Sequence, residues 1–212
     1  MTNQEMLGTL AKLGAIITNS HIVYTSGKHG NVYVNKDAIY PHTEVTSSLC
    51  KVVADHFSKS EIDAVVAPAV GGVILSQWVA HHLSLEKRKV LALYAEKSAD
   101  GSSFIIKRGY DTFVPGRKIL VVEDVLTTGA SVRNVVRAVH ELNGKVVGVA
   151  CLCNRGTLKA KDLGTIGELY SLLEINLETW DATACPLCLK NVPINTRVGK
   201  GLEFIQSQRK TV

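Results

Sequence analysis

Residues 119–131 read Ile-Leu-Val-Val-Glu-Asp-Val-Leu-Thr-Thr-Gly-Ala-Ser, and this stretch decides the fold. Its first four residues form the continuous apolar run of a buried strand, and two carboxylates, Glu123 and Asp124, follow directly. A short loop with two hydroxyl groups and one glycine comes next, and a helical pattern then runs over residues 131–142. A strand, a polar loop and a helix in this order are typical of an open α/β sheet, which binds ligands at the carboxyl ends of its strands.

The loop in this stretch has the chemistry of a phosphate site. Backbone N–H groups and threonine hydroxyls can donate to phosphate oxygens, and the dipole of the following helix favours an anion. Gly129 lets the backbone approach a ligand without a Cβ in the way. Glu123 and Asp124 stand where they could hold ribose hydroxyls, directly or through hydrated Mg²⁺. Any three of these residues alone would favour an ordinary strand–turn–helix with a capping side chain, and a Walker A loop is excluded because Gly-Lys-Ser/Thr is absent.

The same alternation of strands and helices continues on both sides of this stretch. Continuous runs of Val, Ile and Leu predict a parallel sheet with both faces covered. An N-terminal helix carries apolar residues from Met6 to Ile17, and a short hairpin is expected at 21–25 and 31–36 around a turn at 26–30. The expected strands are 63–69, 90–95, 119–122, 146–152 and 169–175, and the expected helices begin at Pro41, at Gly71 and at Ser131; residues 98–103 and the tail from about 181 look irregular.

Composition excludes several classes of protein. The chain has 212 residues, of which 46% are hydrophobic, and this suits one α/β domain with a proper core. A net charge of +5 without a basic run, and only 6% aromatic residues, argue against nucleic-acid binding. We also expect no secretory signal, because the first residues are polar and Glu5 and Lys12 follow, and no membrane span, because the apolar stretches are only as long as strands. Five cysteines do not suggest a secreted disulfide framework, so we expect a cytoplasmic protein.

Taken whole, residues 119–131 resemble the phosphoribosyl-pyrophosphate (PRPP) signature of type I phosphoribosyltransferases. Four further segments resemble the orotate branch of that family: Ser26-Gly27-Lys28-His29 with Tyr33, residues 67–72, residues 148–155, and residues 184–188. The resemblance implies a Mg²⁺-dependent transfer of a phosphoribosyl group from PRPP to orotate. It also implies a single domain over 1–212, with a Rossmann-like core of parallel strands at about 41–175 and a small hood from about 1–40 and 176–212. A homodimer is implied too, in which a mobile loop of one subunit reaches the active site of the other.

The resemblance also assigns roles to individual residues. Catalysis is assigned to Lys97, Glu123 and Asp124, and base binding to Thr127, Arg155 and Tyr33. Mg²⁺ is expected to be held mainly by PRPP and water, without a protein metal site. Taken without the resemblance, the glycine pair at 71–72 could serve tight strand–helix packing, and Arg155 and Lys97 could be surface charges. PRPP binding is assigned to Val70, Gly71, Gly72, Lys97, Glu123, Asp124, Val125, Leu126, Thr127, Thr128, Gly129, Ala130 and Ser131.

The chain departs from the family pattern in three places. Thr25 stands where a basic residue is usual, Gly71 replaces a frequent lysine, and the loop at 96–103 keeps Lys97 but lacks a second lysine and a histidine. Lys36, Lys107 and Arg108 could replace part of this charge. Two alternatives therefore stay open at this point: transfer to another base such as a purine, and a non-catalytic regulator that binds PRPP.

The cysteines suggest a second kind of site. Cys185-Pro186-Leu187-Cys188 has the spacing of a zinc knuckle, and Cys151 and Cys153 are the sulfurs available to complete a set of four. We expect those two to be buried core instead, because they lie on an apolar strand, and a lone CxxC is weak evidence for zinc. Cys50 is also expected in the core. Packing rather than catalysis is expected for Trp78, His81 and His82.

Overall fold

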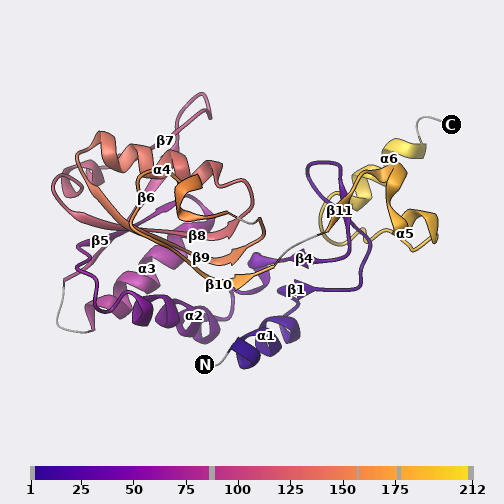
Figure 1. Cartoon of the computed structure of the whole chain (residues 1–212), viewed down its shortest axis with the longest axis horizontal. Helices are drawn as coiled ribbons and strands as arrows, with labels where there is room; N and C mark the ends of the chain where they lie inside the picture. Colours follow the sequence, from indigo (N-terminus) through magenta and orange to yellow (C-terminus); the bar gives the residue numbers. More distant parts are fainter. Residues whose placement is uncertain (1–2, 86–88, 157, 176–177, 210–212) are drawn as a thin grey trace. The chain divides into compact units, whose positions relative to one another are not determined.

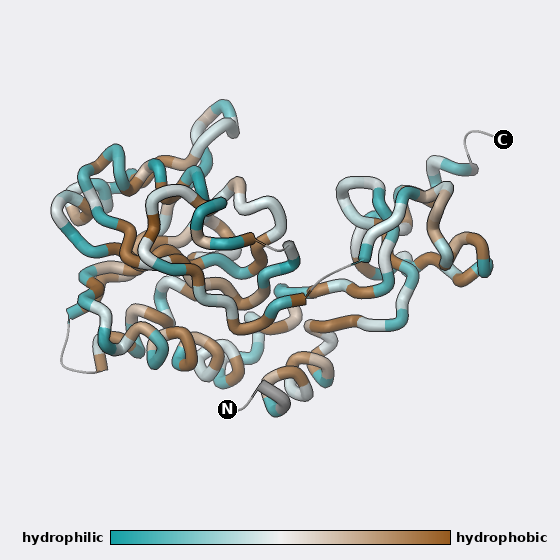
Figure 2. Tube along the Cα trace, viewed as in Figure 1, coloured by the Kyte–Doolittle hydropathy of each residue, from teal (hydrophilic) through white to brown (hydrophobic). Residues whose placement is uncertain are grey.

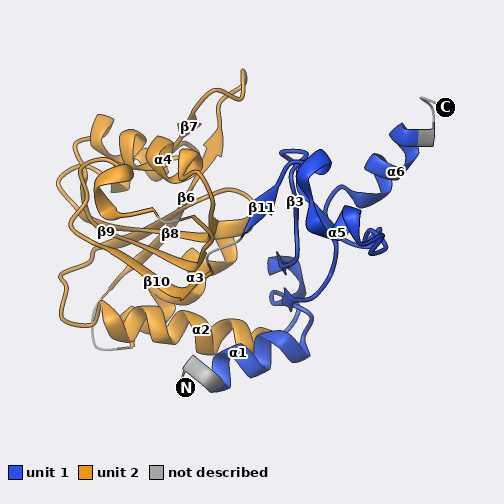
Figure 3. Cartoon of the chain, turned by 45° about the vertical axis from the view of Figure 1, so that its right-hand side comes forward, with its two compact units in different colours: residues 1–42, 176–212 blue, residues 43–175 orange. Residues whose placement is uncertain are grey.

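The computed structural model describes residues 3–85, 89–156, 158–175 and 178–209. The chain divides into two compact units, shown in Figure 3. Unit 2 is the continuous segment 43–175, and unit 1 combines residues 1–42 with residues 176–212. In the described part of the chain, no helix has both the length and the apolar character needed to cross a membrane.

Unit 2 is built around a six-stranded sheet with the strand order β10-β9-β8-β5-β6-β7. Neighbouring strands run parallel, except that β7 pairs antiparallel with β6 at one edge. This arrangement confirms the predicted parallel sheet. The strands are β5 (Ala64–Pro68), β6 (Leu91–Lys97), β7 (Phe104–Ile105), β8 (Lys118–Leu126), β9 (Lys145–Asn154) and β10 (Leu169–Glu174).

Helices cover both faces of this sheet. Figure 1 shows α2 (Thr43–His56) and α3 (Gly71–Ser84) on one face and α4 (Ala130–Glu141) on the other. Successive residues of a strand point to opposite faces, and a strand covered on both faces must be apolar throughout. Residues 119–122 of β8 are accordingly all buried, with exposed fractions of at most 2%.

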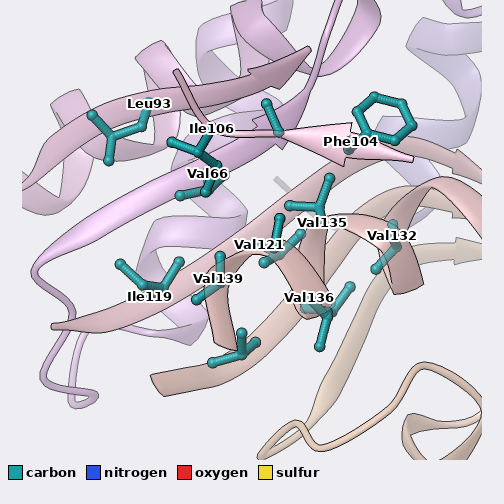
Figure 4. Close-up of a cluster of buried hydrophobic side chains, with 14 of the residues drawn as sticks. Val66, Leu93, Phe104, Ile106, Ile119, Val121, Val132, Val135, Val136 and Val139 are labelled. Carbon is teal, nitrogen blue, oxygen red and sulfur yellow. The ribbon is translucent and has the colours of Figure 1, made fainter. Parts of the chain in front are cut away.

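The core between the sheet and α4 consists largely of β-branched residues (Figure 4). Ile119 and Val121 of β8 face Val132, Val135 and Val139 of α4. These four-residue and three-residue spacings give α4 one apolar stripe, while its other face carries charged side chains. Burying this stripe fixes the start of α4 against the end of β8, and the loop between them is the segment that looks like a phosphate site.

Unit 1 is small and consists of short elements. Its strands form a two-stranded sheet, β1-β4, and a three-stranded sheet, β11-β3-β2. The chain's two ends meet in the second sheet, since Thr179 pairs with Gly30 and Trp180 with His29. The elements are α1 (Asn3–Lys12), β1 (Ile16–Ile17), β2 (Ile22–Val23), β3 (His29–Gly30), β4 (Tyr33–Val34), β11 (Thr179–Trp180), α5 (Pro186–Leu189) and α6 (Gly201–Arg209).

Three local expectations need correction. The strand expected to return over 31–36 is replaced by β3, which pairs with β2, while β4 pairs with β1 instead. β8 continues four residues beyond Val122, because Val125 and Leu126 still pair with Cys153 and Asn154 of β9. The irregular tail contains the helices α5 and α6. The cysteine expectations are confirmed: Cys50, Cys151 and Cys153 are buried, and burial raises their thiol pKa to about 12, 12 and 11.

Candidate active site

The polar segments singled out from the sequence follow four adjacent strands of unit 2. Parallel strands end at the same edge of a sheet, so β9, β8, β5 and β6 deliver their following residues side by side. Arg155 follows β9, the stretch 123–131 spans the end of β8 and its loop, Val70 follows β5, and Lys97 ends β6. The fold thus gathers most of the predicted site at one edge of one rigid sheet.

The loop after β8 forms a small concavity of about 150 Å³ that is lined by Glu123 and residues 125–132. Gly129 has a φ of 72° and is the N-cap residue of α4. Thr127 and Thr128 are exposed, and the first N–H groups of a helix have no partner within the helix. These N–H groups and hydroxyls make the concavity a good anion site.

Gly129 is required by packing as well as by its φ. A Cβ at this position would lie 2.6 Å from Leu163 Cδ2 and 3.1 Å from Leu158 Cδ1. Gly156 is similarly confined, because its Cβ would lie 2.6 Å from the Thr127 carbonyl oxygen. The segment after β9 therefore packs directly against the loop and supports its shape.

The two carboxylates lie at the buried end of β8. Glu123 is 8% exposed and Asp124 is 5% exposed. The Asp124 N–H donates to Glu123 Oε1 at 3.0 Å, and the Val125 N–H donates to Asp124 Oδ1 at 2.6 Å. Strand geometry sends the two side chains to opposite faces of the sheet. Glu123 lines the concavity of the loop, so the two acids are not equivalent neighbours of a ligand.

Arg155 is tied to the loop through the backbone. Its N–H donates to the Leu126 carbonyl at 2.8 Å, and it is only partly buried. Asn154, which precedes it, is 4% exposed, and its side chain donates to the Leu158 carbonyl at 3.0 Å. The structure therefore places Arg155 beside the phosphate-type loop, at the edge of the sheet where a ligand would lie.

The turn after β5 contains an exposed residue and a confined one. Val70 is 84% exposed, and the Ala69–Val70 peptide bond is cis. A Cβ on Gly72 would lie 2.7 Å from Ala67 Cβ and 3.3 Å from the Val122 carbonyl oxygen. Tight packing of α3 on the sheet therefore requires Gly72. The packing interpretation and the ligand interpretation of the glycine pair are compatible at this turn.

Lys97 stands at the base of a hairpin between β6 and β7. The hairpin's turn is hydrophilic, and Figure 2 shows it in teal at the end of a projecting loop. Asp100 orders the turn by accepting from the Ser98 hydroxyl, the Ser102 N–H and the Ser102 hydroxyl at 2.5, 3.1 and 2.7 Å. These hydrogen bonds hold the pKa of Asp100 down at about 2.

Lys107 and Arg108, two of the cations named above as replacements for the missing loop lysine and histidine, lie beside the same hairpin. Glu96 Oε1 accepts from Arg108 Nη2 at 2.7 Å, and Lys107 Nζ lies 3.6 Å from Glu96 Oε2. The hydrogen bond from Arg108 is the main cause of the lowered pKa of Glu96. Lys97, which is exposed, follows Glu96 directly in β6, so this part of the hairpin contains three cations and one acid.

Tyr33 and Lys36 belong to unit 1, in β4 and the short 3-10 helix Lys36–Ala38, and are not part of this group in unit 2. Local patterns missed Arg133, whose Nη1 donates to the carbonyl oxygens of Thr128 at 2.8 Å and Asp162 at 3.2 Å. Arg133 lies in α4, four residues after Gly129, and this spacing places its side chain over the loop. The sequence pattern alone does not reveal that the side chain donates to backbone carbonyls.

Comparison with known proteins identifies this arrangement. The model of the "Phosphoribosyl transferase domain" family matches residues 36–184, which include the whole candidate site in unit 2. The chain belongs to the phosphoribosyltransferase family. It is therefore a phosphoribosyltransferase enzyme with the fold that its sequence predicted.

Several relatives of this phosphoribosyltransferase are described as orotate phosphoribosyltransferases. The chain is 37% identical over 193 residues to an orotate phosphoribosyltransferase of Desulforamulus reducens, covering 91% of this chain and 95% of the relative. Other curated relatives with the same description are 31% to 36% identical.

Solved structures share the fold at lower sequence identity. Orotate phosphoribosyltransferase of Mycobacterium tuberculosis superposes with a TM-score of 0.60 at 22% identity, covering 81% of this chain and 95% of that one. Adenine phosphoribosyltransferase of Rhodothermus marinus gives 0.56 at 22% identity, covering 81% and 99%. Because enzymes named for two different bases share the fold, the fold itself does not select the base.

Proposed function

We propose that this phosphoribosyltransferase transfers the phosphoribosyl group of PRPP to orotate and forms orotidine 5′-monophosphate and pyrophosphate. In this reaction a bond forms between the ring nitrogen of orotate and C1′ of the ribose, and the nitrogen loses its proton to the departing pyrophosphate or to solvent. The bond from C1′ to the pyrophosphate oxygen breaks, and pyrophosphate leaves with the electron pair. The ribose passes through an oxocarbenium-like state, so the protein's contribution is positioning and electrostatic stabilisation.

The observation that carries the proposal is the anion-accepting loop between β8 and α4. Its exposed threonines, its helix N-terminus and its confined Gly129 form a concavity of about 150 Å³, a suitable size for a phosphate group. We assign the 5′-phosphate to residues 127–131, and the ribose hydroxyls to Glu123 and Asp124. The turn at Val70–Gly72 then faces the pyrophosphate, together with a Lys97 that the neighbouring subunit of the proposed homodimer supplies.

Arg155 is assigned to the base. A guanidinium matches a carboxylate with two parallel hydrogen bonds, and orotate carries a carboxylate that uracil and the purines lack. Arg155 adjoins the loop through the hydrogen bond to Leu126, so a base bound there would lie next to the ribose site. Thr127 is the other residue of unit 2 that is assigned to the base. The orotate description of the curated relatives supports this base over a purine and over a regulator.

Mg²⁺ fits the residues present at this edge of the sheet. Carboxylate oxygens are the ligands that Mg²⁺ prefers, and Glu123 and Asp124 supply them at the end of β8. We propose that the ion is held mainly by PRPP and water, with these carboxylates beside it. When bound, it neutralises charge on the departing pyrophosphate.

A homodimer with shared active sites completes the proposal. The hairpin between β6 and β7 projects from the sheet in Figure 1, and Lys97 lies at its base. The proposed role of this hairpin is to carry Lys97 to the pyrophosphate of a neighbouring subunit. The proposal further places the enzyme in the cytoplasm, with no nucleic-acid or membrane partner.

Pyrophosphate release is the direct test of this function. The full chain is incubated with PRPP, Mg²⁺ and one base at a time, chosen from orotate, uracil, adenine, guanine and hypoxanthine. We expect release with orotate, little with uracil and none with the purines. A preference for a purine would overturn the choice of base. If the chain bound PRPP but released no pyrophosphate with any base, the alternative of a non-catalytic regulator would be favoured over the enzyme.

A further inference from the structure

Unit 1 contains a cluster of four side chains that the proposed reaction does not use. His21, His29, Cys185 and Cys188 each point one potential ligand atom at a common centre, and these four atoms lie within 4.8 Å of one another. His21, His29 and Cys185 are at most 1% exposed, and Cys188 is partly buried. All four belong to the same compact unit, so the cluster does not depend on how the two units are arranged.

Three nitrogen–sulfur spacings in the cluster match those of a tetrahedral zinc site. For zinc–sulfur and zinc–nitrogen bonds of about 2.3 and 2.0–2.1 Å, the ligand atoms should be about 3.3–3.8 Å apart. His21 Nε2 lies 3.6 Å from Cys185 Sγ and 3.6 Å from Cys188 Sγ, and His29 Nδ1 lies 3.3 Å from Cys188 Sγ. The two imidazole nitrogens are 2.8 Å apart, so they must separate by about half an ångström to bind the ion.

The orientation of His21 prepares one of the ligand atoms. Its Nδ1 lies 2.7 Å from the Val192 carbonyl oxygen, which can only accept, so Nδ1 carries the proton. The lone pair of Nε2 is therefore directed at the two sulfurs. A histidine that donates its second nitrogen to a backbone carbonyl is the usual support of a metal ligand.

The second histidine and the two cysteines are also held in place. β3 fixes the backbone of His29 between β2 and β11, and the His29 ring lies edge-to-face against Phe204 at 4.9 Å. Cys185 is the N-cap residue of α5, and Cys188 lies within this one-turn helix. The Cys-Pro-Leu-Cys spacing thereby brings both sulfurs to the same side of the turn.

Charge balance favours zinc in this buried position. Two thiolates and two neutral imidazoles around Zn²⁺ sum to zero, and a neutral assembly is the form that burial penalises least. The four protein ligands fill a tetrahedral shell and leave no position for substrate, which is the pattern of a structural site rather than a catalytic one.

We propose that His21, His29, Cys185 and Cys188 bind a structural Zn²⁺ that joins the two ends of the chain within unit 1. The sulfurs Cys151 and Cys153, which the sequence offered as partners of the knuckle, lie in β9 of unit 2, and Cys151 Sγ contacts the Ser171 hydroxyl there. The true partners of the knuckle are two histidines more than 150 residues earlier in the chain. Local spacing could not reveal them.

The proposal is tested by metal content and by cobalt spectroscopy. The full chain is produced in zinc-supplemented medium, purified without chelator, and analysed by mass spectrometry of the elements. We expect about one zinc per chain in the parent, and a loss of at least about tenfold in Cys185→Ser and Cys188→Ser, since structural sites lose most of their affinity with one thiolate. Cys50→Ala is the matched control, because Cys50 is equally buried but lies in α2, and it should keep its zinc.

Cobalt provides a measurement that needs no variant to fold. Zinc is removed and replaced by Co²⁺, which reports its ligands by colour. The parent should show the intense visible bands of tetrahedral cobalt and a sulfur-to-cobalt charge-transfer band in the near ultraviolet. A parent chain with no stoichiometric zinc and no tetrahedral cobalt spectrum would overturn the proposal. Zinc that survives in both cysteine variants would overturn it as well.

Discussion

Gly129 illustrates how one residue controls the phosphate loop. An alanine at this position would meet both a left-handed φ of 72° and a contact of 2.6 Å with Leu163 Cδ2. We expect Gly129→Ala to weaken PRPP binding by at least about tenfold, equivalent to about 1.4 kcal/mol, because the loop must shift to relieve the contact. Calorimetric titration with PRPP and Mg²⁺ measures this change.

Gly116 provides the matched control for that substitution. It has a φ of 73° in the turn before β8, but a Cβ there would have no neighbour within 4 Å. Gly116→Ala should therefore lose stability from its φ alone and keep its PRPP affinity. Equal affinities in the Gly129 and Gly116 variants would show that the loop's shape does not govern binding.

A substitution of Arg155 tests how the base is recognised. Arg155→Ala removes the proposed partner of the orotate carboxylate, so the KM for orotate should rise about ten- to a hundredfold. The KM for PRPP should change far less, because the loop donors remain. Arg137→Ala serves as the control, since Arg137 is an exposed arginine of α4 beside Glu141. The measurement is steady-state kinetics with each substrate varied in turn. A joint rise of the KM values for orotate and PRPP would contradict the assignment.

At the scale of elements, the hairpin of β6 and β7 is the part whose function depends most on its charges. Lys97 ends β6 opposite Phe104, and Glu96, which precedes it, pairs with Arg108. Lys97→Ala should lower kcat by roughly a hundredfold, the usual scale for one charge-stabilising donor. Lys51→Ala on α2, where an exposed lysine pairs with Asp55, should leave kcat unchanged. Full turnover in the Lys97 variant would remove the hairpin from the mechanism.

Asp100 gives the same hairpin a dependence on pH. Its pKa is depressed to about 2, so its contribution to hairpin order is present above its unfolded value of about 4 and is lost as pH falls through 2. Asp100→Asn removes that charge at neutral pH. Limited proteolysis should then cut residues 98–103 faster in the variant than in the parent, and PRPP with orotate should slow both. Identical cutting rates would mean that the turn is ordered by other contacts.

Elements also show why sequence patterns succeed in one half of the fold and fail in the other. β5, β8 and β9 of unit 2 are apolar runs long enough to identify, and the polar stretch 123–131 is recognisable from its residues alone. The end of β8 was less visible, because Glu123 and Asp124 look like the start of a loop, whereas β9 pairs with β8 as far as Leu126. Elements of two residues in unit 1 have no periodicity, and one of the pairings, Trp180 with His29, joins residues about 150 positions apart. Residues such as Arg133 act through backbone carbonyls, which no side-chain pattern records.

At the scale of the whole molecule, the shared active site is the remaining proposal. An Asp124→Asn chain lacks the ribose side of its site, and a Lys97→Ala chain lacks the cation delivered to a neighbour. Mixed dimers of the two should regain part of the activity that each variant loses, because one of the two sites then has both residues intact. Activity of heterodimers isolated with two different affinity tags is the measurement. Verified heterodimers without recovery would show that each subunit supplies its own lysine.

The division of the chain has a consequence for its synthesis on the ribosome. Residues 1–42 leave the exit tunnel before the segment 43–175, yet the strand β11 and the cysteines that complete their unit emerge only after that segment. The continuous segment 43–175 carries all partners of its own sheet and can fold while translation proceeds. The nascent N-terminal segment therefore stays incompletely folded during this time. β3 has no partner on one side, and the histidines that are buried in the folded protein are still exposed. Slow translation of residues 176–212 would prolong that vulnerable interval, during which a chaperone has the most to protect.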